Sequence, residues 1–226
     1  MASIVLRPTA DSSLNHSCSS GSSGYALVNE ATADGDSTYI YQTIEVNDVS
    51  TTAASIFKIS GADVGKIKIG SIQLTINAKT TKGNSNDSAN VAAKLTINGN
   101  AGAWLSGTLS TSYGDFTKTY SASDLSLNDA VLDSFDSANI TVQVETSGKK
   151  NAKKNDDFQN RITQVYVTLE YEPVSDTTTT GIHLKQNGAY TQAQAAYKKV
   201  NGVWVQQTDT AALKAEILSG RYKYGG

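Results

Sequence analysis

Two histidines and one cysteine limit the chemistry that this chain can perform. The histidines are His16 and His183, and the single cysteine, Cys18, lies two residues from His16. A Cys–His pair can act as nucleophile and base, but only when a rigid scaffold holds both side chains. This pair lies in a Ser- and Gly-rich segment, residues 12–24, which we expect to be a flexible surface loop without a catalytic role. A zinc site needs about four suitable ligands, and we expect no metal or other cofactor.

Acidic residues suggest two further kinds of chemistry. Asp34, Asp36 and Glu30 place three carboxylates around a turn, whereas calcium needs about six to eight oxygens, so an Asp-Gly turn is the preferred interpretation. Glycoside hydrolysis uses a pair of carboxylates. Scattered acids are expected in any polar protein, so we expect no enzyme. The carboxylates available for such a pair are Asp115, Asp124, Asp133 and Glu145.

Aromatic residues offer a third option, the binding of a carbohydrate. An exposed ring with polar side chains nearby can hold a sugar, and Trp104, Tyr113 and Asp115 are the candidate glycan contacts. Tyr39 and Tyr41 share one face of an expected strand. The alternative interpretation is that most of these rings belong to the core or to strand surfaces.

Alternating apolar residues predict the elements that must position these side chains. Four segments place an apolar residue at every second position, which is typical of strands with one buried face. Their other positions are rich in Thr, Gln, Asn and Lys, which indicates a solvated outer face. The four strong strands are 72–78, 91–97, 140–145 and 165–171, and shorter strands are expected at 3–7, 39–46, 55–59 and 116–120.

About eight strands predict a mainly β fold, an antiparallel, jelly-roll-like β-sandwich over residues 1–173. Pro8 and Pro173 follow the first and last expected strands, and proline is a natural strand stop. Residues 174–181 lack an apolar anchor and are the expected linker. Residues 182–226 are the expected small C-terminal module of β-hairpins and one short helix.

This C-terminal module contains an internal repeat around two Asn-Gly pairs, at 187–188 and 201–202. Asn-Gly favours a type I′ turn, so each copy predicts a hairpin. Residues 211–219 predict a short helix. A single hairpin is marginally stable in water, so we expect the module to dock or to oligomerise, for example as a trimer. The candidate assembly contacts are the aromatic residues Tyr190, Trp204, Tyr222 and Tyr224.

Charge and hydropathy exclude several partners. The net charge of −2 does not favour nucleic acid, and no stretch reaches the roughly eighteen apolar residues of a membrane span. The N-terminal residues lack the pattern of a signal peptide, and the single cysteine cannot form an internal disulfide, so we expect synthesis in a cytoplasm. Residues 149–157 combine four lysines with two aspartates and predict a solvated hairpin tip. Contact of these lysines with an acidic partner is the alternative.

Three segments resemble proteins of phage particles. Residues 30–40 resemble an acidic turn that leads into Thr-Tyr-Ile in phage virion sandwich domains, and residues 161–172 resemble the last strand of those domains. Residues 196–205 resemble a short module that ends many phage tail and appendage proteins. The resemblance implies a multimeric, particle-exposed structural or receptor-facing protein, and it implies no catalytic residues.

We therefore expect a virion structural protein, assembled in the host cytoplasm and released by lysis, whose partners are other virion proteins. The Asn-Gly-Val-Trp segment favours a tail or baseplate appendage over a capsid decoration or head-fibre protein. A glycan-binding receptor module, with a host-surface glycan as partner, is the alternative. An esterase or glycosidase is the third and weakest hypothesis.

Overall fold

The chain folds into two compact units, Met1–Val174 and Ser175–Gly226, in a computed structural model. The structure describes residues 1–45, 50–82, 84–127, 139–150 and 157–174 in full. It describes residues 131–132, 183–186, 189–192, 196–200 and 203–207 as strand backbone. Each unit is considered by itself below.

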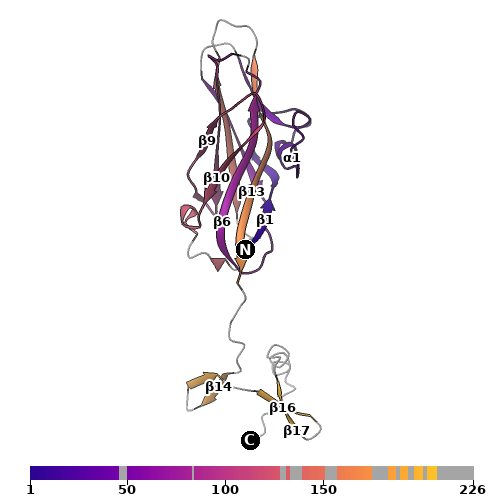
Figure 1. The fold of residues 1–226 in the computed structure, drawn as a ribbon, viewed down its shortest axis with the longest axis vertical. Coiled ribbons are helices and arrows are strands. Elements are labelled where there is room, and N and C mark those ends of the chain that lie inside the picture. The colour runs from indigo at the N-terminus through magenta and orange to yellow at the C-terminus, as the bar shows by residue number, and fades with distance from the viewer. Residues whose placement is uncertain are drawn as a thin grey trace. The chain divides into compact units, whose positions relative to one another are not determined.

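Two antiparallel sheets form the first unit (Figure 1). The described strands of sheet A follow the order β10-β6-β13-β4-β3, with β1 paired to β13 and β11 paired to β6. Their bounds are β1 Ala2–Leu6, β3 Ser17–Cys18, β4 Ile40–Ile44, β6 Ile67–Thr80, β10 Gly114–Tyr120, β11 Val131–Leu132 and β13 Phe158–Pro173.

Sheet B follows the order β2-β5-β12-β7-β8, with β9 paired to the free edge of β7. Its bounds are β2 Pro8–Ser13, β5 Thr51–Ile59, β7 Ser88–Ile97, β8 Asn100–Ala101, β9 Leu105–Thr108 and β12 Ile140–Lys149. Two short helices complete the unit, α1 at Gly24–Val28 and the 3₁₀ helix η1 at Ser123–Leu125.

The core lies between the inner faces of the two sheets. Leu74 and Ile76 of β6 and Val142 and Val144 of β12 are fully buried, whereas the residues between them on β12 face outward and are partly exposed. Burial of one apolar face per sheet drives this arrangement. The predicted mainly β, antiparallel, jelly-roll-like sandwich is confirmed.

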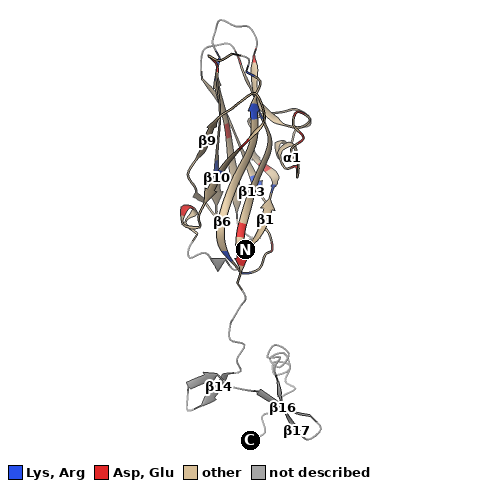
Figure 2. Cartoon of the chain, viewed as in Figure 1, with Lys and Arg blue, Asp and Glu red and all other residues tan. Residues whose placement is uncertain are grey.

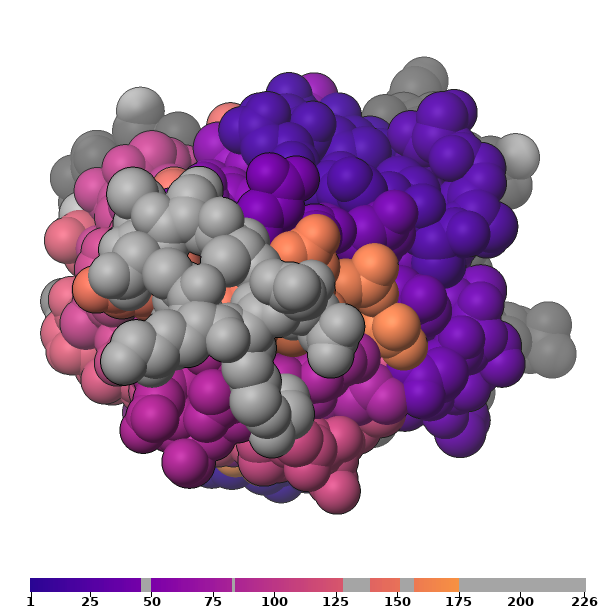
Figure 3. Space-filling view, turned by 90° about the horizontal axis from the view of Figure 1, so that it is seen from above, coloured from indigo at the N-terminus to yellow at the C-terminus, as the bar shows by residue number. Residues whose placement is uncertain are grey.

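The last strand is longer than its alternation predicts. β13 begins at Phe158, and a register shift between Ile162 and Gln164 places four consecutive buried residues, 162–165, in its first half. A bulge of this kind breaks the period of two, which hides the strand from a search for alternation. Figure 3 shows the orange atoms of β13 between the indigo N-terminal segment and the magenta atoms from the middle of the chain.

The two prolines have different roles. Pro173 ends β13, as predicted, whereas Pro8 both follows β1 and begins β2. The first position of a strand tolerates proline because the missing N–H need not join the ladder. β1 and β13 are paired neighbours, with Ala2 opposite Tyr171.

The prediction of a surface loop fits residues 20–23, which are exposed, but it is wrong for the rest of residues 12–24. This segment contains the end of β2, the short strand β3 and the start of α1. The Asp11 carboxylate accepts hydrogen bonds from the backbone N–H groups of Gly24 (2.9 Å) and Tyr25 (2.7 Å). These bonds satisfy N–H groups that open the helix, and Leu27 is buried against the core. Low sequence complexity therefore did not mean the absence of regular elements here.

The lysine-rich segment also departs from its prediction in part. Lys150, expected at a solvated hairpin tip, is buried, and its Nζ lies 3.5 Å from Asp157. An opposite charge is the usual partner of a buried lysine. Residues 151–156 lie outside the described part of the chain.

In the second unit, two antiparallel strand pairs correspond to the two copies of the repeat. β14 (His183–Gln186) pairs with β15 (Ala189–Gln192), and β16 (Ala196–Val200) pairs with β17 (Val203–Gln207). Tyr190 lies on β15 and Trp204 on β17. The Asn-Gly pairs, the expected helix at 211–219, residues 175–182, Tyr222 and Tyr224 lie outside the described residues, so their roles stay predictions.

Among the described residues, no helix combines the length and the apolar character that a membrane crossing requires. Figure 2 shows lysine, arginine, aspartate and glutamate dispersed along the strands of the first unit on the side that it displays.

Candidate functional site

His16 lies inside the sandwich, where it joins a small polar cluster. It is 4% exposed, with its Nδ1 2.8 Å from the Ser55 Oγ and its Nε2 3.0 Å from the Thr146 Oγ1. The Ser55 Oγ also accepts the backbone N–H groups of Asn15 (3.1 Å) and His16 (3.2 Å). Thr146 in turn contacts the side-chain amide of Gln42 at 2.9 Å.

The hydrogen bonds determine which nitrogen of His16 carries the proton. Since the Ser55 Oγ already accepts two N–H groups, its own proton is donated to the His16 Nδ1, and the Nε2–H is donated to Thr146. A second proton on the ring would face an oxygen with no free lone pair. Burial lowers the pKa of His16 to about 4, so the ring is neutral at pH 7.

The structure therefore contains a hydrogen-bonded Ser55–His16 pair that was not predicted from the sequence. Its burial prevents a substrate from the solvent from reaching the Ser55 hydroxyl. Ser55 is completely buried and His16 nearly so, which leaves no approach for a substrate. Cys18 lies on β3 opposite Ile40, and burial, followed by the charge of Asp11, raises the pKa of its thiol. A protonated thiol is a poor nucleophile, so the Cys–His hypothesis has no support in this geometry.

The outer face of sheet A carries a cluster of charged and aromatic residues. Arg161 of β13 lies opposite Lys79 of β6, and both donate to the Asp36 carboxylate, at 2.7 and 2.6 Å. The Tyr113 hydroxyl donates to the same carboxylate at 3.1 Å. The Arg161 guanidinium lies 4.4 Å from the centre of the Tyr39 ring. We call these five residues the Asp36 cluster.

Electrostatics show that the Asp36 cluster is satisfied internally. The hydrogen bond from Lys79, with smaller contributions from Arg161 and Tyr113, lowers the pKa of Asp36 to about 2. Burial, followed by the charge of Asp36, raises the pKa of Tyr113. Both cations and the phenol thus share one carboxylate, which fastens the segment that carries Asp36 to the sheet.

The two acids expected beside Asp36 are also bound by the protein. The Thr38 Oγ lies 2.6 Å from the Glu30 Oε1 and 2.8 Å from the Asp34 Oδ2, and its single proton is donated to one of these carboxylates at a time. Asp34 also accepts the backbone N–H of Thr38 at 3.2 Å. Gly35, between the aspartates, has a positive φ of 68°, as a tight Asp-Gly turn requires. Within the described part of the chain, no three His, Cys, Asp or Glu side chains form a group that could hold a metal ion.

The structure separates the three candidate glycan contacts. Tyr113 and Asp115 lie on sheet A, where Asp115 accepts the Asn77 Nδ2–H at 2.7 Å. Trp104 precedes β9 and lies on sheet B. The sequence could not show this separation, because the two sheets alternate along the chain.

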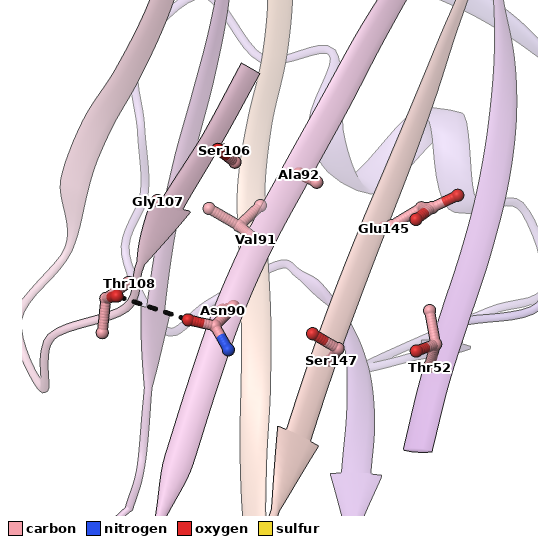
Figure 4. A pocket seen from close by; sticks show the side chains of 9 residues that line it. All are labelled: Thr52, Asn90, Val91, Ala92, Ser106, Gly107, Thr108, Glu145 and Ser147. Carbon is pink, nitrogen blue, oxygen red and sulfur yellow. Dashed lines mark hydrogen bonds between the residues drawn. The ribbon is translucent and has the colours of Figure 1, made fainter. Parts of the chain in front are cut away.

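Sheet B has an open depression of about 380 Å³ on its outer face (Figure 4). It extends across β5, β12, β7 and β9, where small residues such as Ala92 leave room between longer polar side chains. Thr108 donates to the Asn90 Oδ1 at 3.3 Å along one edge. We call this depression the sheet B groove; its lining residues are Thr52, Asn90, Val91, Ala92, Ser106, Gly107, Thr108, Glu145 and Ser147.

Trp104 and Lys94 stand next to the sheet B groove. The register pairs Ala92 with Ser106, so the next outward positions along these two strands are Lys94 and Trp104. The Lys94 Nζ lies 4.7 Å from the centre of the indole ring, which confirms that both side chains share the outer face. Trp104 is 42% exposed, so a large part of its ring surface is open to solvent.

The carboxylates proposed for glycoside hydrolysis do not come together. Glu145 lines the sheet B groove and accepts from the Gln143 Nε2 at 2.6 Å, whereas Asp115 lies on the other sheet. Asp124 accepts the backbone N–H of Ser121 at 2.8 Å beside η1. Asp133 lies outside the described residues. Among the groove residues described above, Glu145 is the one carboxylate, so they supply no acid–base pair.

Sequence reasoning missed most of the groove. Asn90, Ser147 and Thr52 belong to three strands that are distant in sequence, and only the pairing of β7, β12 and β5 brings them together. Their positions as outward residues of alternating strands were the available signal. That signal does not distinguish a groove from any other solvated sheet face.

No protein-family model matches the chain, and no curated protein matches it. A solved structure described as CBM35 from Cellvibrio japonicus Abf62 is 14% identical, with a TM-score of 0.32, and covers 77% of this chain and 100% of its own. The CBM36-1 domain of a multidomain xylanase from the hindgut metagenome of Trinervitermes trinervoides is 10% identical, with a TM-score of 0.28, and covers 76% and 100%.

The atomic structure of Broad Bean Stain Virus is also 10% identical, with a TM-score of 0.30, and covers 64% of this chain and 91% of its own. Similarity at this level identifies neither a family nor a function. The sandwich assignment follows from the strand pairing described above.

Proposed function

We propose that this chain is a structural protein of a phage particle and that its sandwich binds a glycan in the sheet B groove. The observation that carries the glycan proposal is the position of the exposed Trp104 ring beside an open groove lined by hydroxyl, amide and carboxylate groups. The polar groups of the groove line an open depression, although Asn90 and Glu145 each also accept one hydrogen bond from a neighbouring side chain. In the Asp36 cluster, by contrast, both cations and the phenol bind one carboxylate.

The chemistry of the groove suits a saccharide. Sugar rings present apolar C–H faces that pack on an aromatic ring, together with hydroxyls that both donate and accept hydrogen bonds. Glu145 can accept from such hydroxyls, and Asn90 and Ser147 can donate or accept. A ligand that lies along the groove would reach these groups with one end and the Trp104 ring with the other.

We expect binding without hydrolysis. Cleavage of a glycosidic bond needs an acid and a second carboxylate at a fixed separation. The described groove offers Glu145 alone, and the buried Ser55–His16 pair offers no access.

The phage assignment is supported by the resemblance of three segments to virion proteins and by the presence of a second compact unit after the sandwich. We propose that this unit attaches the protein to other virion proteins or to copies of itself, through Tyr190, Trp204, Tyr222 and Tyr224. A tail or baseplate appendage is the preferred location, and a capsid decoration or head-fibre protein is the second candidate. Immunogold labelling of particles would separate them, because gold on the tail supports the first and gold on the head supports the second.

Substitution of Trp104 tests the glycan site. We expect Trp104→Ala to abolish binding of the full-length protein to its ligands on a glycan array while the melting temperature changes little, since the ring is substantially exposed. Tyr113→Ala on sheet A is the matched control and should retain binding. Loss of binding in the Tyr113 variant alone would place the site on sheet A, and an array without any signal for the unaltered oligomer would contradict the glycan proposal.

A further inference from the structure

Lys94 has an unusual environment for a surface cation. Its ammonium lies over the Trp104 ring, and among the described residues it has no carboxylate within ion-pair distance. The lysine and arginine of the Asp36 cluster, by contrast, both bind an aspartate. A cation–π contact with an exposed ring is weak, and the ring does not occupy all three N–H donors of the ammonium, so Lys94 retains donors for a ligand.

Lys94 stands next to the sheet B groove on strand β7. Ala92 lines the groove, and Lys94 is the next outward residue on the same strand, about 7 Å further along. On the adjacent strand β12, Gln143 lies directly opposite Lys94, and its neutral amide adds no charge. The groove is therefore bordered by a cation on the side where Trp104 stands.

Glu145 gives the rest of the groove the opposite polarity. It pairs with Ala92 across the strands, which places it diagonally from Lys94 at the separation of second neighbours, about 7–8 Å. Its carboxylate is bound by Gln143 on its own strand rather than by the lysine. A ligand with hydroxyls near Glu145 and a negative charge near Lys94 would match both ends of this arrangement.

We propose that the ligand of the sheet B groove is an anionic saccharide, whose negative group binds Lys94 beside the Trp104 ring. This inference rests on the proposed glycan-binding function and specifies its substrate class. Lys94 is a specificity-determining residue in this arrangement, and Trp104 supplies the contact that charged and neutral sugars share.

Pairs of saccharides that differ mainly in their negative charge measure how much that charge contributes to binding. Tetragalacturonate and its fully methyl-esterified form differ in charge at the carboxyl groups, and sialyllactose and lactose differ by one acidic residue. A sulfated oligosaccharide with its unsulfated parent distinguishes a sulfate from a carboxylate as the source of the charge. Binding is measured by quenching of Trp104 fluorescence in a full-length Trp204→Phe background, since the chain has two tryptophans.

For at least one pair, we expect the acidic probe to bind roughly fivefold more tightly than its neutral counterpart, the ratio expected for one exposed ion pair. Lys94→Gln should reduce the acidic affinity to the neutral level and leave the neutral affinity unchanged. Lys94→Arg should retain the preference, and added salt should diminish it.

The outcomes separate the inference from the function on which it rests. Equal binding of acidic and neutral probes, or an acidic preference that survives Lys94→Gln, overturns the role of Lys94 and leaves glycan binding intact. Binding by none of these probes, together with a blank glycan array, overturns both. A Lys94→Gln protein that loses neutral and acidic ligands equally would show that the lysine only positions the indole.

Discussion

The buried His16 cluster and the sheet B groove differ in what they leave for a ligand. The cluster holds a serine and a histidine 2.8 Å apart, the residue types of a hydrolase, but every polar atom of that pair is bound inside the protein. The groove has no such pair, yet its hydroxyl, amide and carboxylate groups face an open depression. Access to a ligand, rather than residue type, separates the two regions.

The outer faces of sheet A and sheet B also differ in how their cations are bound. On sheet A, the Asp36 carboxylate binds both Lys79 and Arg161. The described part of sheet B shows no equivalent contact at Lys94. The polar residues of sheet A are therefore bound to one another, whereas the binding that we propose for sheet B uses polar residues that remain open to solvent.

The largest expected effect concerns the buried cluster and is a dependence of stability on pH. The pKa of His16 is about 4 in the folded protein against 6.5 in the unfolded chain, so the unfolded chain takes up a proton first as the pH falls. The free energy of unfolding should therefore be unaffected by His16 above pH 6.5 and decrease by about 3 kcal/mol between pH 6.5 and 4.

Urea denaturation at several pH values would measure this loss. A His16→Gln protein is the control, because it retains the carboxylates but has no imidazole at this position. Parallel curves for the two proteins between pH 6.5 and 4 would be incompatible with a buried, neutral His16.

A pair of serine substitutions compares the two regions directly. Ser55→Ala leaves two backbone N–H groups and the His16 Nδ1 without their partner, and we expect it to reduce the free energy of unfolding by about 2 kcal/mol without changing glycan affinity. Ser147→Ala, on the outer face of the same sheet, should change stability by less than about 0.5 kcal/mol. Chemical denaturation and the glycan assay together measure both effects, and equal destabilisation by the two substitutions would remove the distinction.

Asp36→Ala should have a smaller effect on stability. Without the carboxylate, Lys79 and Arg161 face each other across neighbouring strands, but the Asp36 side chain is 54% exposed, so we expect a loss of only about 1 kcal/mol. Since surface charge is screened, the loss should shrink as salt is added. Glycan binding should persist in this variant, and its disappearance would move the site to sheet A.

Much of the fold could be predicted because apolar and polar residues alternate within each strand, and this alternation indicates which face of the strand is buried. Strands such as β7 and β12 keep a strict period of two, and the sequence locates them well. The bulge at residues 162–164 interrupts that period, so the first half of β13 was missed. The order at residues 12–24 was also missed, because it depends on bonds to Asp11 and Ser55, which lie outside that segment.

The candidate site was predicted only in fragments. Trp104 was identified as a large aromatic residue near a loop, and its exposure supports its selection. Tyr113 and Asp115 were grouped with it although they belong to the other sheet, because nearness in sequence does not determine which sheet a strand joins. Lys94 was not identified at all, since its importance depends on the register of β7 with the segment that precedes β9.

The position of β13 within sheet A has a mechanical consequence. β13 pairs with β6 along one edge and with β4 and β1 along the other, and it ends at Pro173, where the chain leaves the sandwich. Tension applied from the C-terminal side therefore pulls along the axis of a central strand. The hydrogen bonds on both edges then resist in shear and must break together, whereas an edge strand pulled outward would unzip one bond at a time. This shear geometry applies when the sandwich is held at the opposite end of sheet A, because β1 begins beside the C-terminal end of β13, where Ala2 lies opposite Tyr171.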